Sequence, residues 1–203
     1  MHIPDGFLNT PVTLATVGVS GLTLVYSLKK VNQSIRPEQI PLLGLLASFV
    51  FMIQLFSFPI GIGTSIHLTG ALLISILVGP LAGFLIMTIS LFALALLFQH
   101  GGMLSLGANI LNMGVVGCFL GYGIYQLIPG RRASLIIAGL LSGLVSASFC
   151  ALELALSGML ELSSAFTTML LIYGITGTIE GVVSMFILEF LKKIKPELLE
   201  STA

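Results

Sequence analysis

The feature that most constrains this chain is a series of apolar stretches, most of them as long as a lipid bilayer is thick. A transmembrane helix needs about 20 mostly apolar residues, and seven stretches lie near residues 10–28, 40–58, 66–79, 80–98, 106–127, 133–156 and 164–191. Only 8% of the 203 residues are charged, against about 25% in soluble domains. The sequence therefore predicts an all-α, polytopic membrane helix bundle with about seven transmembrane helices, forming a single membrane-embedded domain over residues 1–203.

The third stretch, near residues 66–79, is short for a bilayer and ends at Gly79-Pro80. Glycine followed by proline is typical of a turn, so the fourth stretch is expected to begin at once. A short apolar segment is accommodated by tilting or by covering only part of the membrane. Two interpretations therefore stay open: seven full spans, or six spans plus a re-entrant hairpin.

The basic residues all follow the first, fifth or seventh stretch, so an odd number of spans places them on one side of the membrane. They are Lys29, Lys30, Arg36, Arg131, Arg132, Lys192, Lys193 and Lys195. Because cytoplasmic loops carry an excess of Lys and Arg, we expect the N-terminus and residues 1–9 outside, and the C-terminus with its tail 196–203 in the cytoplasm. A cleaved signal peptide has basic residues before its apolar core, whereas here they follow it, so the mature chain is expected to begin at Met1.

A histidine at position 2 offers an unusual way to bind a metal ion. The amine of Met1, the backbone nitrogen of His2 and its ring nitrogen Nδ1 can bind one ion together, once the amide has lost its proton. Such tetragonal nitrogen sites suit Ni²⁺ and Cu²⁺, with Co²⁺ as a further candidate. Pro4-Asp5-Gly6 predicts a turn that folds the first residues back towards the bundle. Binding is expected to release protons from both the amine and the amide; the alternative is an ordinary polar tail.

The other two histidines, His67 and His100, are expected on the same outer side as His2. His67 follows a glycine-rich loop and can supply the fourth in-plane nitrogen. Ser65 or Thr64 can cap the third helix or support the His67 ring. An ordinary hydrogen-bonded histidine at a helix start explains His67 equally well, and a solvated loop residue is the simpler interpretation of His100.

Four polar residues lie within the predicted spans. Asn109 and Asn112 are three positions apart and share a face near the outer end of the fifth span. Glu153 lies near the outer end of the sixth span, where it can offset charge, and Glu180 lies in the middle of the seventh. An intramembrane carboxylate normally faces the bundle interior or a cavity, so we expect a structural or a conformational role for Glu180.

Several segments together resemble the NikM/CbiM family, the substrate-binding (S) components of energy-coupling factor importers for nickel and cobalt. They are the N-terminal Met-His-Ile-Pro-Asp-Gly-Phe-Leu, then Gly63-Thr-Ser-Ile-His-Leu-Thr-Gly70, Gly79-Pro80 and His100-Gly-Gly-Met-Leu-Ser-Leu-Gly-Ala-Asn-Ile-Leu-Asn112. The resemblance covers most of the first 125 residues and implies that Met1, His2 and His67 bind the metal. Residues expected to support these ligands are Ser65, Asn109, Asn112 and His100.

The resulting hypothesis is capture of a transition-metal ion at the outer face as the transported substrate, with Ni²⁺ favoured over Co²⁺ by the usual affinity order. The sequence has no G-x-x-x-x-G-K-[ST] nucleotide motif, so it is not expected to be an enzyme. The resemblance implies the plasma membrane of a prokaryote. It also implies a membrane coupling (T) subunit, cytoplasmic ATPase subunits and a small accessory membrane subunit as partners, and the zero net charge indicates no nucleic acid. The alternative is a proton-coupled secondary metal transporter using Glu153 and Glu180.

Overall fold

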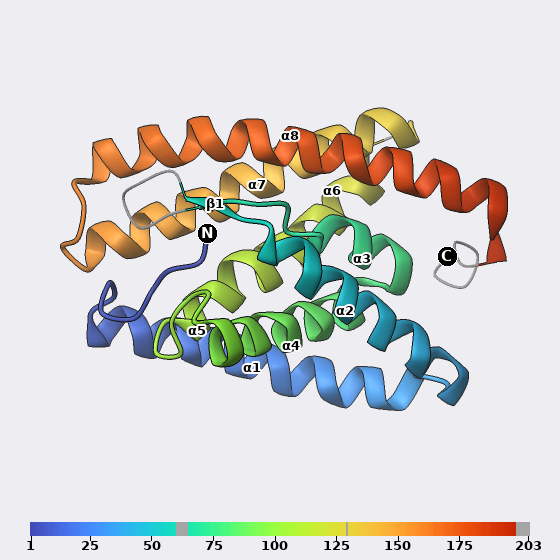
Figure 1. Ribbon diagram of the computed structural model, residues 1–203, viewed down its shortest axis with the longest axis horizontal. Helices are drawn as coiled ribbons and strands as arrows, with labels where there is room; N and C mark the ends of the chain where they lie inside the picture. The colour runs from blue at the N-terminus through green and yellow to red at the C-terminus, as the bar shows by residue number, and fades with distance from the viewer. Residues whose placement is uncertain (60–64, 129, 198–203) are drawn as a thin grey trace.

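The computed structural model describes residues 1–59, 65–128 and 130–197, and these are almost entirely helical (Figure 1). In chain order the elements are α1 (Thr10–Ser34), η1 (Pro37–Gln39), α2 (Ile40–Leu55), β1 (Phe58–Pro59), β2 (Ser65–Ile66), α3 (Ala71–Val78), α4 (Pro80–Phe98), α5 (Leu106–Asn109), η2 (Ile110–Leu120), α6 (Gly121–Leu127), α7 (Arg131–Leu156) and α8 (Leu162–Ile194). The strands β1 and β2 form a two-residue antiparallel pair. The helical bundle predicted from the sequence is confirmed.

Within the described residues, six helices are long and apolar enough to cross a membrane. They are α1, η1 with α2, α4, the continuous run α5–η2–α6, α7 and α8. The third predicted stretch forms α3, which has eight residues and therefore extends only about 12 Å. The described residues therefore form six long apolar helices and the short helix α3, rather than seven helices of full spanning length.

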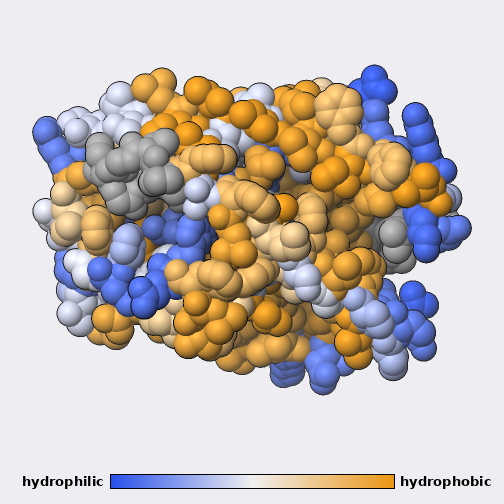
Figure 2. Space-filling view, in the orientation of Figure 1, coloured by the Kyte–Doolittle hydropathy of each residue, from blue (hydrophilic) through white to orange (hydrophobic). Residues whose placement is uncertain are grey.

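The outer surface of the bundle is apolar over most of its length. Figure 2 shows hydrophobic residues across the middle of the molecule and hydrophilic residues gathered towards its two ends. Large apolar side chains project from it, such as Leu22 at 76% exposed and Leu45 at 67%. A soluble monomer rarely exposes so large a contiguous apolar surface, and lipid-facing helices do so as a rule. The protein is thus a multi-pass membrane protein.

The N-terminal segment and the last turn of α8 lie towards opposite ends of the bundle (Figure 1). Basic residues mark one end, where α1 and α8 finish and α7 begins: they include Lys30, Arg132 and Lys192. The N-terminal segment and the loop between α4 and α5 lie at the other end. This arrangement agrees with the grouping of charges expected from the sequence, and the sidedness of the membrane remains the prediction made from that grouping.

The helix α3 forms the centre of the core, because its residues Ala71–Leu77 are all buried. A helix that is apolar on all sides requires neighbours on all sides, and α3 packs against α4, η2, α6 and α8. Glycines bring α7 and α8 together, since a β-carbon on Gly177 would lie 2.5 Å from the carbonyl oxygen of Gly139. Small residues at a helix interface permit this close backbone approach in membranes. The contact fixes the position of α8, which carries Tyr173 and Glu180 among its buried polar residues.

Candidate metal centre

The N-terminal segment folds back into the bundle and is buried there. Met1 and His67 are each 2% exposed, and His2 is 6% exposed. The amine nitrogen of Met1 lies 3.2 Å from Nε2 of His67, although the two residues are 66 positions apart. The predicted turn at Pro4-Asp5-Gly6 is present, and Gly6 has φ of 85°, a conformation that glycine adopts without strain. We call the Met1 amine, the His2 nitrogens and the His67 ring the nitrogen cluster.

The ring of His67 is oriented by its own backbone. Its Nδ1 lies 3.2 Å from the carbonyl oxygen of Leu68, and because a carbonyl only accepts, Nδ1 carries the hydrogen. In the neutral ring Nε2 then keeps its lone pair, and Nε2 is the atom that faces the Met1 amine. A hydrogen bond that fixes the tautomer in this way is typical of histidines that bind metals.

Three histidine rings converge at this end of the bundle. The ring of His2 lies 4.5 Å from that of His67 and 4.1 Å from that of His100, measured between centroids. Both ring nitrogens of His2 and Nε2 of His100 are buried and have no hydrogen-bond partner among the described residues. Buried polar atoms are nearly always satisfied, so orphaned imidazole nitrogens at one point indicate a site built for a ligand that the protein does not itself supply.

Asn109 secures the N-terminal segment through both ends of its side-chain amide. Its Oδ1 accepts from the backbone nitrogen of Ile3 at 2.8 Å, and its Nδ2 donates to the carbonyl oxygen of Ile3 at 3.1 Å. The backbone nitrogen of Gly102 donates to the same carbonyl at 2.9 Å. Because Ile3 directly follows His2, these three hydrogen bonds determine where the first two residues lie. The supporting role expected for Asn109 thus has a concrete form.

Asp5 connects the N-terminal segment to the loop before α5. Its carboxylate accepts from the backbone nitrogens of Met103 at 3.1 Å, Leu104 at 2.8 Å and Ser105 at 3.1 Å. The approach is close enough that a β-carbon on Gly102 would overlap the Asp5 side chain. The glycine pair after His100 therefore has a steric cause, and the sequence argument, which treated Asp5 only as part of a turn, missed this contact.

Tyr173 of α8 is a second contact that the sequence argument missed. It is 1% exposed, and its hydroxyl accepts a hydrogen bond from the Met1 amine. A tyrosine hydroxyl in the middle of an apolar run requires a polar partner when buried, which was the available signal. The helical register that aims this hydroxyl at the amine was not visible in a uniformly apolar stretch.

Burial controls the protonation of the nitrogen cluster. Removal from water lowers the pKa of the Met1 amine from 8.0 to about 5. The same desolvation, followed by the nearby cationic groups, lowers the pKa of both His2 and His67 well below 6.5, and burial also lowers the pKa of His100. Desolvation disfavours the charged form of a base. At pH 7 the amine and the rings are therefore neutral and able to donate lone pairs.

Glu180 holds the start of α3 next to His67. Its carboxylate accepts from the backbone nitrogen of Thr69 at 2.9 Å and from the Thr69 hydroxyl at 2.7 and 2.8 Å. The backbone N–H groups of Gly70 and Leu72 also lie near this carboxylate. The first N–H groups of a helix have no partner within the helix, and a carboxylate there also suits the helix dipole. The sequence left open a structural or a conformational role for Glu180, and these contacts correspond to the structural role.

The other expected supporting residues are placed differently. Asn112 donates from Nδ2 to Glu153 at 2.7 Å, while its backbone carbonyl accepts from Ser146 at 2.7 Å. The expectation that Ser65 caps the third helix is wrong, because α3 begins at Ala71 and Gly70 is its N-cap. Thr64, the alternative cap, and the side chain of Ser65 lie outside the part of the chain that the structure describes.

The nitrogen cluster can place four nitrogens around one metal ion. Metal–nitrogen bonds are about 2.0–2.1 Å long, so neighbouring corners of a square plane lie about 2.9 Å apart. The observed 3.2 Å between the Met1 amine and Nε2 of His67 is near this value. Within the described residues no three His, Cys, Asp or Glu side chains are grouped to hold a metal ion. A site here would therefore combine the histidine rings with the Met1 amine or a backbone nitrogen.

A multi-span membrane protein with buried nitrogen donors converging at one end belongs to the class of transition-metal transporters. The chain is a member of the family described as the cobalt uptake substrate-specific transmembrane region, whose model matches residues 2–198. It is 33% identical to the fused nickel transport protein NikMN of Rhodobacter capsulatus, over 98% of this chain and 64% of that protein. It is 32% identical to the cobalt transport protein CbiM of Desulforamulus reducens, over 98% and 84%.

A solved structure agrees with these relatives. The crystal structure of a truncated transition metal transporter matches with a TM-score of 0.90 at 32% identity, covering 95% of this chain and 99% of that one. The family resemblance read from the sequence is thereby confirmed. The chain therefore belongs to a family of metal transport proteins.

Proposed function

We propose that the nitrogen cluster captures Ni²⁺ or Co²⁺ as the substrate-specificity subunit of an energy-coupling factor importer. The ligands are the Met1 amine, the deprotonated amide and Nδ1 of His2, and Nε2 of His67. The observation that carries the proposal is the approach of the Met1 amine to Nε2 of His67, 3.2 Å apart, both buried and with a lone pair available. His100 and Asn109 support the site, since one touches the His2 ring and the other holds Ile3.

Nickel is the favoured substrate on chemical grounds. Four in-plane nitrogens form the tetragonal environment that Ni²⁺ prefers, and Ni²⁺ binds such donors more tightly than Co²⁺ in the usual order. Mg²⁺ and Ca²⁺ require six or more oxygen ligands, whereas the donors of the nitrogen cluster are nitrogens. The site therefore selects borderline metals over the abundant hard cations.

The sequence contains no G-x-x-x-x-G-K-[ST] nucleotide motif, so uptake driven by ATP would draw its energy from other subunits. We propose a membrane coupling subunit and cytoplasmic ATPases as partners, with a small accessory membrane subunit. The buried state of the ligands fits a carrier better than an open pore. Both Met1 and His67 are 2% exposed, so the metal is enclosed after capture. It can leave only when the N-terminal segment moves, or when the segment between β2 and α3 that carries His67 moves.

The test is Ni²⁺ binding by calorimetry to the detergent-solubilised chain, after intact mass spectrometry has shown that Met1 is retained. Acetylation of the Met1 amine and the substitution His67→Gln should each weaken binding by more than 100-fold, because each removes one strong ligand. His100→Gln, which removes a supporting ring but no ligand, should change the affinity by less than tenfold. A one-residue extension is a poorer probe, since it makes His2 third in the chain and creates a different amine–amide–imidazole chelate.

Spectroscopy tests the geometry independently of affinity. Ni²⁺ in a plane of four nitrogens is diamagnetic, so the bound metal should add no paramagnetic shift to the spectrum. Tight binding that survives acetylation, or a paramagnetic six-coordinate Ni²⁺ centre, would contradict the N-terminal chelate.

The proton-coupled alternative makes a different prediction for vesicles. It requires the chain alone to accumulate metal when a pH gradient is imposed, with uptake lost in Glu153→Gln and Glu180→Gln. Both carboxylates have hydrogen-bond partners within the bundle, and no observation favours a relay between them. We therefore expect metal accumulation only when the coupling and ATPase subunits are present with ATP.

A further inference from the structure

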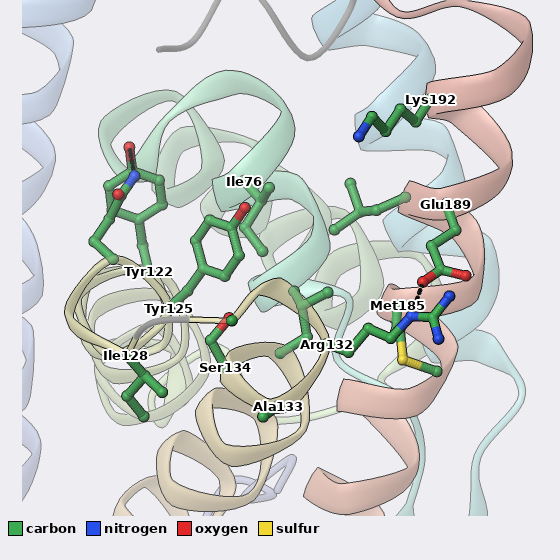
Figure 3. A pocket seen from close by; sticks show the side chains of 14 residues that line it. Ile76, Tyr122, Tyr125, Ile128, Arg132, Ala133, Ser134, Met185, Glu189 and Lys192 are labelled. Atoms are coloured by element: carbon green, nitrogen blue, oxygen red, sulfur yellow. Dashed lines mark hydrogen bonds and ion pairs between the residues drawn. The ribbon is translucent and has the colours of Figure 1, made fainter.

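A large pocket opens at the end of the bundle opposite the nitrogen cluster. It has a volume of about 930 Å³ and lies between α6, the start of α7 and the last turns of α8, with α3 behind it (Figure 3). Ligand pockets typically measure about 300–1,000 Å³, so the space suits one medium-sized molecule or part of a larger one. The metal site has no use for this pocket, which contains none of its residues.

The inner wall of the pocket is apolar. Ile76 of α3, Leu135 of α7, and Met185 and Leu188 of α8 form it. Leu135 is 4% exposed and Leu188 8%, so this wall belongs to the hydrophobic core of the bundle. An apolar wall of this kind binds hydrocarbon and gives nothing to a small hydrated anion.

The rim of the pocket is aromatic and cationic. Tyr122 and Tyr125 stand on the α6 side, and Lys192 extends over the pocket from α8 (Figure 3). Tyrosines are enriched where a helix meets the membrane–water interface, which places the rim at the level of the lipid headgroups. The pocket therefore has its apolar part towards the bilayer and its polar part at the surface.

The charges on the rim leave a positive excess. Nε of Arg132 donates to Glu189 at 2.5 Å in an exposed ion pair. In the described part of the chain, neither Lys192 nor the terminal nitrogens of Arg132 have a recorded hydrogen-bond or ion-pair partner. A lysine in the last turn of a helix also suits the helix dipole, but this does not explain why it overhangs a pocket. Arg132 and Lys192 together carry two positive charges against the one negative charge of Glu189. The remaining positive charge complements one phosphate.

We propose that this pocket binds an anionic phospholipid of the membrane leaflet on the basic side. The phosphate lies between Lys192 and Arg132, and the first part of an acyl chain lies against the apolar wall. Basic pockets between transmembrane helices are the usual sites for such headgroups. The apolar wall favours a phospholipid over free phosphate, because only the lipid has an acyl chain to place there. The positive charge of the rim favours an anionic lipid over a zwitterionic one.

The test is native mass spectrometry of the full chain with phosphatidylglycerol, and with phosphatidylcholine of the same acyl chains. One phosphatidylglycerol should bind at least tenfold more tightly than phosphatidylcholine, and 10 mM inorganic phosphate should not compete. The double variant Arg132→Gln/Lys192→Gln should remove this preference. Ala133→Trp, which fills the pocket without changing charge, should weaken both lipids.

Lys195→Gln is the matched control, because it removes a neighbouring charge that does not line the pocket. Unchanged Ni²⁺ affinity in every variant shows that the bundle is folded, since the metal site lies at the opposite end. Equal binding of the two lipids, competition by free phosphate, or loss of the preference in Lys195→Gln would overturn the proposal. An unaltered lipid preference in the double variant would also overturn the proposal, and would fit a pocket that a partner subunit covers instead.

Discussion

The protonation state of the nitrogen cluster predicts how many protons leave when Ni²⁺ binds. With ordinary pKa values of 8.0 for the amine and 6.5 for each imidazole, about 0.9 of the amines and 0.2 of each ring carry a proton at pH 7. Adding the amide proton, binding would release about 2.4 protons. With the amine pKa lowered to about 5 by burial and both rings lower than usual, all three are neutral, and only the amide releases about one proton.

The sign of the pH dependence follows from the same values. A base whose pKa is lowered in the folded protein competes with the metal only below that lowered pKa. From pH 8 to pH 6 the affinity should therefore fall about tenfold per pH unit, through the amide alone, and more steeply below pH 5. Ordinary pKa values would give about 250-fold per unit near pH 7.

Calorimetry in buffers of different ionisation enthalpy counts these protons directly. The free peptide Met-His-Ile-Pro-Asp-Gly is the control, because its exposed amine should release about two protons at pH 7. More than two protons from the protein would refute the burial argument. No proton release would refute the amide as a ligand.

Three substitutions test the contacts around the nitrogen cluster. Tyr173→Phe removes the hydroxyl that holds the Met1 amine, worth about 1 kcal/mol, so the Ni²⁺ dissociation constant should rise about fivefold in calorimetry. Gly102→Ala places a β-carbon on Asp5 and should weaken Ni²⁺ binding more than tenfold, whereas Gly123→Ala, where a β-carbon meets nothing within 4 Å, should not. Glu180→Ala leaves the Thr69 N–H and hydroxyl, just before α3, without their acceptor and should lower stability by about 1–3 kcal/mol. Glu180→Gln, which keeps one acceptor, should cost less in thermal unfolding.

The long helices could be predicted because hydrophobic length alone defines a membrane span. The predicted stretch 80–98 coincides with α4, and 106–127 with the run from Leu106 to Leu127. The helix α1 continues to Ser34, past the predicted end at residue 28, because lysines are good helix formers and extend a span beyond the membrane. The shortness of α3 was visible in its length, but its place at the centre of the core depends on packing that no single stretch encodes.

The candidate site could be predicted only in part. The sequence placed Met1 and His67 at the same end of the bundle. It could do so because the chelate depends only on neighbouring residues, and the side of each loop depends only on the charges next to each span. The distances could not be predicted, because Asn109 and Tyr173 set them through contacts spanning 106 and 172 positions. The protonation of the amine was also misjudged: its release of a proton at neutral pH is not expected once burial has lowered its pKa to about 5.

Burial also determines which ions the nitrogen cluster rejects. Of the nearby carboxylates, Asp5 accepts from backbone amides, Glu180 accepts from Thr69, and Glu153 accepts from Asn112 through Oε2 only. A bound dication is therefore balanced by the single negative amide and by bonds to nitrogen lone pairs. An exposed N-terminal chelate would let water oxygens complete the shell of Mg²⁺, which gives up its water reluctantly. The donors of the buried cluster are nitrogens, and the Tyr173 hydroxyl contacts it with one oxygen. A hard ion entering it would lose most of its hydration without replacement, so a thousandfold excess of Mg²⁺ should leave Ni²⁺ binding in calorimetry unchanged.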